Sequence, residues 1–158
     1  MSSKDAAQYD AFMLDAISQA RQAMSAGDVP VGAVVVRDGR VIAAAHNRSA
    51  IDADPTAHAE ILAIRSAAAA VGDRRLTGCT MVMTLEPCAM CAAALVLARV
   101  DHLVYGADDP KAGAVTSLYA ICTDKRLNHQ IEVISGLRAD ECSRMLSDFF
   151  RARRATGG

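Results

Sequence analysis

Residues 57–98 have the sequence AHAEILAIRSAAAAVGDRRLTGCTMVMTLEPCAMCAAALVLA. From about Ala57 to Val71 the apolar residues recur with a helical period, which predicts a helix with one buried face. The run Thr80–Leu85 is typical of a buried strand, and the segment from Cys88 to Ala98 predicts a second helix that is apolar almost all round. Such a helix must be covered on several sides, so this unit points to a layered domain.

The ends of the two predicted helices carry recognisable signals. Thr56 is a residue type that caps helix N-termini, and Gly72 is a residue type that ends helices. Pro87 stands just before the second helix, where the first turn tolerates a proline because its missing N–H has no partner to lose. We therefore expect the first helix to begin after Thr56 and the second at Pro87.

The rest of the chain continues this pattern on both sides. Asp38-Gly39 separates two β-branched runs, which predicts a hairpin with a tight turn. The other predicted elements are helices over 9–26 and 140–153 and strands over 31–37, 41–46, 101–106 and 131–135. Helices that alternate with strands predict an α/β fold with three layers, α/β/α, around a mixed five-stranded sheet.

Length and composition limit the class of protein. The 158 residues fit a single domain over 1–158, with flexible ends expected at 1–8 and 155–158. The formal net charge of −1 gives no global basic field, so any nucleic-acid contact must come from a local patch. Five cysteines are a poor disulfide framework. With a polar N-terminus and no apolar run that spans a bilayer, we expect a cytoplasmic protein without membrane contact.

Three residues have the chemistry and spacing of a metal site. Cys88 and Cys91 are three apart at a predicted helix start, which places both sulfurs on one face and favours their thiolate form. His58 opens the preceding helix, and one strand connects the two helices, so their starts can meet at one edge of the sheet. Three ligands leave a fourth tetrahedral position open, as in catalytic zinc sites, so we expect one Zn²⁺ per chain.

Glu60 is the predicted acid–base residue. It lies two residues after His58, where a carboxylate can take a proton from a metal-activated water and return it to a substrate. Neither His-x-Glu nor Cys-x-x-Cys is specific alone, since a buried thiol pair beside a surface histidine explains each. The joint pattern His-x-Glu and Pro-Cys-x-x-Cys is the signature of zinc deaminases of nucleobases. The sequence therefore predicts hydrolytic deamination.

Further motifs accompany this pattern. They are DVPVGAVVV at 28–36, HNR at 46–48, DPTAHAEI at 54–61, TLEPCAMC at 84–91, YGADDPKAG at 105–113, LNH at 127–129, ADEC at 139–142 and LSDFFRARR at 146–154. With them the chain resembles, from about residue 9 to 154, the bacterial tRNA-specific adenosine deaminases of the zinc-dependent cytidine deaminase superfamily. The resemblance implies the cytidine deaminase fold, a homodimer, and conversion of adenosine to inosine at the wobble position of a tRNA anticodon.

The resemblance also implies substrate contacts. It assigns Asn47 a hydrogen bond to the target nucleotide, and Ala59, Glu86 and Pro87 backbone contacts near the reacting base. The residues expected on the rim, where an anticodon stem-loop would bind, are Asp109, Lys111, His129, Phe150 and Arg153. Residues 114–126 depart from the family pattern, because Val115 and Thr116 stand where the family has a small residue before Ser-Leu.

Two other functions compete with this interpretation. One is a deaminase of a free base or nucleoside, of the guanine or cytosine type, which would close its pocket over a small ligand. The other is a structural zinc module that binds RNA without chemistry, and Glu60 argues against it because such a site needs no acid–base residue. Phe149, Phe150 and the basic residues after them favour the tRNA substrate.

Overall fold

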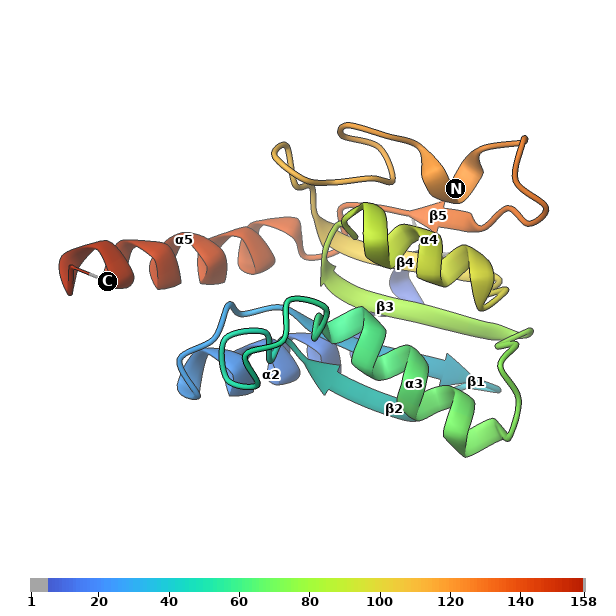
Figure 1. Cartoon of the computed structure of the whole chain (residues 1–158), viewed down its shortest axis with the longest axis horizontal. Coiled ribbons are helices and arrows are strands. Elements are labelled where there is room, and N and C mark those ends of the chain that lie inside the picture. Colours follow the sequence, from blue (N-terminus) through green and yellow to red (C-terminus); the bar gives the residue numbers. More distant parts are fainter. Residues whose placement is uncertain (1–5, 158) are drawn as a thin grey trace.

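The computed structural model describes residues 6–157. Its helices are α2 (Asp10–Ser25), α3 (Ala59–Val71), α4 (Ala89–Leu97) and α5 (Ala139–Ala155), with a 3-10 turn η1 (Ile121–Thr123). Its strands are β1 (Gly32–Arg37), β2 (Arg40–His46), β3 (Cys79–Leu85), β4 (His102–Ala107) and β5 (Glu132–Ile134). The predicted order of helices and strands is confirmed (Figure 1).

The five strands form one mixed sheet in the order β2-β1-β3-β4-β5. Strand β1 is antiparallel to both β2 and β3, whereas β3, β4 and β5 run parallel. Asp38 and Gly39 have φ of +51° and +74°, the left-handed values that a tight hairpin turn requires. The parallel pairing of β3 with β4 needs a crossover, and α4 provides it.

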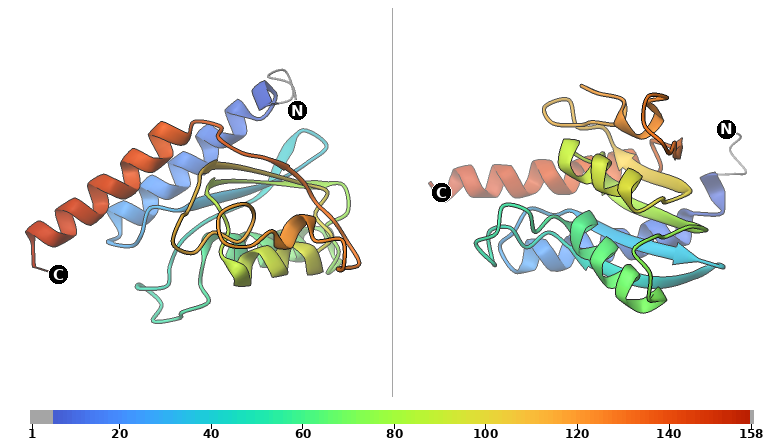
Figure 2. Two further views of the ribbon diagram at one scale, coloured as in Figure 1. Left: turned by 90° about the horizontal axis from the view of Figure 1, so that it is seen from above. Right: turned by 45° about the vertical axis from the view of Figure 1, so that its right-hand side comes forward.

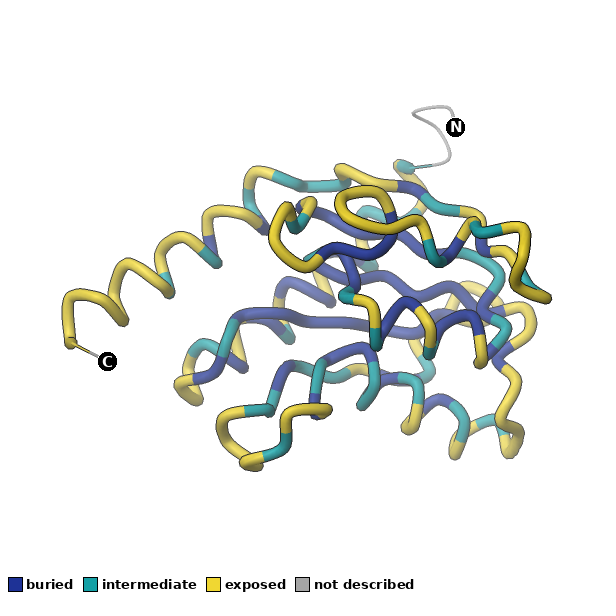
Figure 3. Tube along the Cα trace, turned by 45° about the horizontal axis from the view of Figure 1, so that its top comes forward, coloured by how far each residue is buried: buried dark blue, intermediate teal, exposed yellow. Residues whose placement is uncertain are grey.

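Helices cover both faces of the sheet, as the predicted three-layer architecture requires (Figures 1 and 2). Figure 2 shows α2 and α5 side by side on one face, with α3 and α4 on the other. The strand side chains alternate between these layers. Val34, Val82 and Val104 belong to the core under α2 and α5, while Val35 and Met81 belong to the core under α3 and α4. The three central strands β1, β3 and β4 are the most continuously buried part of the described chain (Figure 3).

The start of α3 corrects the sequence prediction. The helix begins at Ala59, and its N-cap is His58 in an extended conformation. The prediction of a Thr56 cap is wrong, because the Thr56 hydroxyl donates to Asp54 at 2.8 Å instead. The Asp54 carboxylate also accepts the Thr56 N–H at 2.9 Å, so a local turn engages both polar groups of Thr56.

Helix α4 also begins later in the sequence than predicted. Its N-cap is Cys88, with ψ of 176°, so Pro87 lies before the cap and not in the first turn as predicted. The Pro87 carbonyl oxygen accepts the N–H of Ala114 at 2.8 Å, which holds this residue against the long connection after β4. As a result, the cap residue of each helix is a predicted metal ligand, and its side chain lies at the helix end.

Two further features complete the fold. The connection from β4 to β5 contains η1, which the sequence did not predict, and lies over α4 (Figure 1). Of the ends that we expected to be flexible, residues 1–5 and 158 lie outside the described residues, and α5 continues to Ala155. Among helices within residues 6–157, none combines the length and apolar character needed to cross a membrane.

Candidate active site and metal centre

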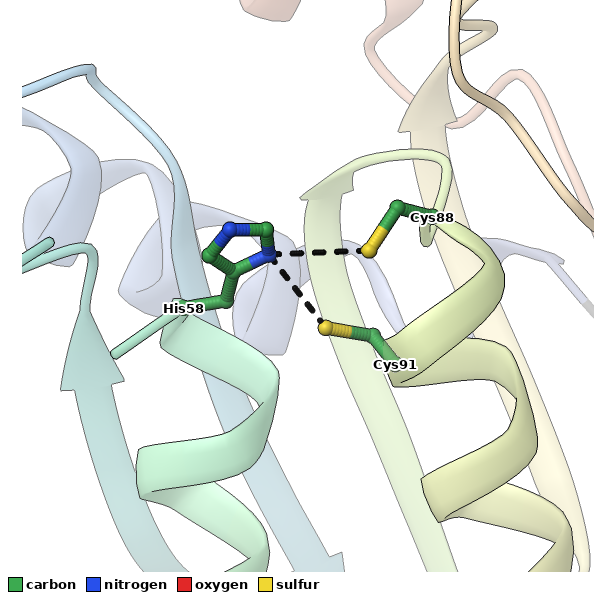
Figure 4. A group of neighbouring side chains, drawn as sticks. All are labelled: His58, Cys88 and Cys91. Atoms are coloured by element: carbon green, nitrogen blue, oxygen red, sulfur yellow. Dashed lines mark hydrogen bonds between the residues drawn. The ribbon is translucent and has the colours of Figure 1, made fainter. Parts of the chain in front are cut away.

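The starts of α3 and α4 lie next to each other at one edge of the sheet and bring the predicted ligands together (Figure 4). The His58 Nδ1 atom is 3.6 Å from the Cys88 sulfur and 3.5 Å from the Cys91 sulfur. The three ligand atoms lie within 4.8 Å of one another. In a tetrahedral zinc site with Zn–N and Zn–S bonds of about 2.0 and 2.3 Å, nitrogen and sulfur are about 3.5 Å apart. The three residues therefore fit a zinc ion.

The protonation of the two thiols also suits a cation. Hydrogen bonds from Cys91 and His58 outweigh burial and lower the pKa of Cys88 to about 4. The hydrogen bond to Cys88, together with burial, raises the pKa of Cys91. The two sulfurs lie against an imidazole, and a divalent cation at their centre would bind both in the thiolate form.

Glu60 is buried in the first turn of α3 and lines the same pocket as His58 and Asn47. Desolvation by burial is the largest influence on its carboxyl group and raises the pKa of Glu60. A carboxyl group that holds a proton more readily than usual can both accept a proton and return it. This is the behaviour that the predicted acid–base role requires.

Asn47 follows β2 and lies on the pocket wall, as the resemblance implies. Its side-chain nitrogen donates to Asp28 at 2.8 Å and to Ser49 at 3.2 Å. Asp28 is fully buried and also accepts the N–H groups of Val29, Ala50 and Ile51. An ionised carboxylate only accepts, so Asp28 fixes which way the Asn47 amide points. Sequence analysis missed Asp28, although it opens one of the family motifs.

Ala59, Glu86 and Pro87, the residues with predicted backbone contacts to the substrate, differ in what their backbone groups bind. Ala59 is buried at the first turn of α3, where N–H groups have no partner within the helix. The Glu86 N–H donates to Ala107 at 2.8 Å, and the Pro87 carbonyl accepts from Ala114. Glu86 lines the pocket, but its side chain is only 2% exposed and is engaged within the protein. Burial favours a raised pKa for Glu86, but hydrogen bonds from Ser117, Thr116 and Asp109 lower it to about 2.

The pocket is small and adjoins a larger groove. The pocket holds about 220 Å³ and is lined by Val29, Val31, Asn47, Ser49, His58, Glu60, Leu85, Glu86, Cys88, Asp109 and Ala112. The groove holds about 720 Å³ and is lined by Val29, Leu85, Asp108, Asp109, Pro110, Lys111, Ser143, Leu146, Ser147, Phe150, Arg151 and Arg154. Val29, Leu85 and Asp109 line both, so the two cavities lie side by side.

The groove contains three of the five predicted rim residues, and Arg153 and His129 are not among those that line it. Asp109, Lys111 and Phe150 line it, as predicted. Arg153 instead lies over the Phe149 ring at 5.4 Å, on another face of α5. Arg151 and Arg154 line the groove, because they stand one helical turn after Ser147 and Phe150, which line it as well.

His129 lies apart from both cavities. Its Nε2 atom is 2.7 Å from the carbonyl oxygen of Val100, just before the start of β4. The pocket lies at the opposite end of that strand, where Leu85 is paired with Ala107. The structure therefore does not bring His129 to the residues that surround the pocket.

Known proteins share this sequence and fold. The sequence model of the MafB19-like deaminases matches residues 7–154. A tRNA-specific adenosine deaminase of Bacillus subtilis is 48% identical over 147 residues, which cover 93% of this chain and 91% of the relative. A tRNA-specific adenosine deaminase of Haemophilus influenzae is 46% identical over 140 residues, covering 88% of this chain and 81% of the relative.

Solved structures agree with these relatives. A structure from a study of A-to-I editing by tRNA:A34 deaminases is 48% identical, with a TM-score of 0.82 over 85% of this chain and 98% of that chain. A guanine deaminase from Nitrosomonas europaea is 27% identical, with a TM-score of 0.78 over 89% of this chain and 83% of that chain. The fold predicted from the sequence is therefore confirmed.

The geometry of the three ligands predicts about one zinc ion per chain. Changing Cys88 or Cys91 to Ala should remove most of the metal, because two ligands hold zinc poorly. Plasma mass spectrometry of the purified protein measures the metal content. Cys142→Ala is the matched control, since Cys142 is a buried thiol in the other core and should leave the zinc in place. Full zinc occupancy in the double variant of Cys88 and Cys91 would contradict the assignment.

Proposed function

Because this chain belongs to the MafB19-like deaminase family, we propose that it deaminates adenosine to inosine at the wobble position of a tRNA anticodon. The main support is a pocket of about 220 Å³ that holds His58, Glu60 and Cys88 and adjoins a groove lined with basic residues. Relatives 41–48% identical to the chain are tRNA-specific adenosine deaminases. Since its substrate would be tRNA, we place the enzyme in the cytoplasm.

The pocket residues have distinct parts in this reaction. His58, Cys88 and Cys91 would hold Zn²⁺, which when bound lowers the pKa of water and so supplies a nucleophile at neutral pH. Glu60 takes the proton that the water loses as its oxygen bonds to the purine carbon. Glu60 then carries protons to the ring nitrogen and to the departing amino group, so adenosine and water become inosine and ammonia. Asn47 holds the nucleotide in place.

The groove favours a substrate base that is part of a nucleic-acid strand over a free base. A pocket this small accepts one base, and a base within a loop must be splayed out to enter it. The nucleotides next to that base would then lie in the groove, where Lys111, Arg151 and Arg154 can contact phosphates and Phe150 offers an aromatic face. A groove of this kind has no use in an enzyme whose substrate ends at the pocket.

We also propose a homodimer formed through α3 and α4. Leu97 is 79% exposed on α4 and lines a groove together with Ile61 and Ile64, with arginines also along its walls. Leu118 and Tyr119, on the connection that lies over α4, are also more than half exposed. An apolar surface of this kind is costly in water, and a second copy related by a two-fold axis would cover it.

The substrate is tested with three compounds. An anticodon stem-loop with adenosine at the wobble position should be converted to inosine, while free adenosine and free guanine should not react, with products measured by mass. Glu60→Gln is the control for chemistry and should keep zinc while losing roughly 10²–10⁴-fold in kcat/KM. Efficient turnover of guanine with an untouched stem-loop would replace the proposal with a free-base deaminase.

The groove is tested with two arginine variants that differ only in position. Arg154→Ala should weaken stem-loop binding and lower its dependence on salt by roughly one counterion, because it removes one phosphate contact. Arg153→Ala removes the same charge from another face of α5 and should change the salt dependence much less. Binding titrations across several salt concentrations measure both. Equal effects of the two variants would show that the groove does not guide the RNA.

The dimer is tested by placing charge on its proposed interface. Leu97→Arg should convert the protein to a monomer at micromolar concentration, as measured by sedimentation, because it buries an unpaired charge. Leu14→Arg is the control, since Leu14 is an exposed leucine on α2, on the opposite face of the sheet. A wild-type protein that sediments as a monomer would rule out the proposed interface.

A further inference from the structure

Glu86 is a buried carboxylate for which the proposed chemistry has no use. It is 2% exposed, yet five donors surround it. These donors are the backbone N–H groups of Asp109 at 2.9 Å, Val115 at 3.1 Å, Thr116 at 2.8 Å and Ser117 at 2.9 Å, and the Ser117 hydroxyl. A carboxylate has about four lone-pair positions. Its acceptor capacity is therefore filled by the chain itself.

All five donors belong to residues 109–117, which we call the rim segment. This segment has no helix or strand of its own, so its backbone N–H groups need other partners. Asp109 accepts the N–H groups of residues 111–113, whereas the N–H groups of Asp109 and of residues 115–117 donate to Glu86. It provides Asp109 and Ala112 to the wall of the pocket, and Asp109 and Lys111 to the wall of the groove. Glu86 thus holds the segment that separates the reaction centre from the proposed RNA path.

The same residue is joined directly to the metal centre. Glu86 stands two positions before Cys88, and Cys88 itself forms an isolated β-bridge with Gly113 of the rim segment. A Cβ atom built on Gly113 would lie 2.3 Å from the Glu86 side chain, so the backbone of the rim segment rests on the carboxylate. The place of the rim segment relative to the ligands therefore depends on the Glu86 carboxylate, together with the β-bridge to Cys88 and the hydrogen bond from Ala114 to Pro87.

A second contact ties the rim segment at its other side. The Tyr105 hydroxyl lies 2.9 Å from the Asp108 carboxylate and 2.8 Å from the Thr116 hydroxyl. Thr116 is one of the two residues that depart from the family pattern, and its side chain adds this contact. The Tyr105 hydroxyl supports the segment from β4, and the Pro87 carbonyl accepts the N–H of Ala114. Glu86 accepts the three backbone N–H groups that follow Ala114.

We propose that Glu86 is a positioning residue that holds the rim segment in place for RNA. Its carboxylate would keep Asp109 and Lys111 at a fixed place relative to Cys88, so that they meet the nucleotides next to a base in the pocket. This inference rests on the proposed function, since it takes RNA as the substrate. A glutamine has the same shape but only one acceptor oxygen, and its NH₂ group would face backbone N–H donors.

The first experiment needs no substrate. In hydrogen–deuterium exchange of the zinc-loaded protein, Glu86→Gln should speed exchange of peptides from the rim segment by roughly tenfold or more, because the amides that donate to one of the two carboxylate oxygens lose their acceptor. Peptides from β3 should be unchanged. Glu132→Gln makes the same substitution at an exposed residue near the start of β4 and should leave the rim segment protected. Unchanged exchange in Glu86→Gln would overturn the proposal.

The second experiment asks whether Glu86 acts through the rim segment. Glu86→Gln should raise KM for the stem-loop by roughly tenfold, with a smaller change in kcat and full zinc content. Lys111→Ala should weaken binding in the wild type but add little in the Glu86→Gln background, because the displaced rim segment no longer presents that lysine. Independent, multiplicative effects of the two variants would overturn the proposal.

A milder variant keeps the test valid if Glu86→Gln does not fold. Ser117→Ala removes one of the five donors and leaves the carboxylate charged, so exchange in the rim segment and KM should both rise about two- to fivefold. No change in either would count against the proposal. If the wild-type chain does not act on the stem-loop, the proposed function fails. If it does and both Glu86→Gln and Ser117→Ala behave normally, only this inference fails.

Discussion

The site depends on two helices that begin at the same edge of one sheet. Strand β3 runs between the end of α3 and the start of α4, so both helix starts lie together. The first N–H groups of a helix have no partner within it, and the helix dipole adds positive potential there. His58 and Cys88 occupy the two cap positions. The positive potential there favours the thiolate form of Cys88, and it also favours an anionic or polarised oxygen of a bound molecule. The rest of the site is arranged around this pair of helix ends.

Three buried carboxylates near these helix ends have different surroundings, and the surroundings decide what each can do. Asp28 and Glu86 each accept four or more hydrogen bonds, mostly from backbone N–H groups, and so organise loops. Burial removes water from the Glu60 carboxyl group, and this desolvation is the largest influence on its pKa and raises it. The donors around Glu86 lower its pKa, whereas desolvation raises that of Glu60, so Glu60 is the better suited of these two to exchange a proton.

The near-neutral net charge of the chain is compatible with RNA binding because the charges are unevenly placed. Lys111, Arg151 and Arg154 come from two segments far apart in the sequence and line one groove. Asp108 and Asp109 lie on the same wall, so the groove has both signs of charge and contains no uniform basic field. A local arrangement of this kind can fix the register of a phosphate chain without a large overall charge.

The sequence alone determined the features that depend on short-range periodicity and residue chemistry. It predicted the order of elements, the turn at Asp38-Gly39, the end of α3 at Gly72 and the grouping of one histidine with two cysteines, because each of these follows from spacings within a few residues or from a motif. The mixed sheet followed from the alternation of helices and strands. The predicted roles of Glu60 and Asn47 rested on the motif, and the structure brings both residues to the pocket.

Only the tertiary structure decided which polar groups meet. Glu86 finds its donors 23 to 31 residues further along the chain, and no local pattern announces such a pairing. The rotation of α5 about its axis turns Arg154 into the groove and Arg153 onto Phe149, although both stand in one basic run. His129 contacts the carbonyl oxygen of Val100, at the end of β4 that lies away from the pocket. Side-chain identity fixes what a residue can bind, but the packing of distant elements fixes what lies within reach.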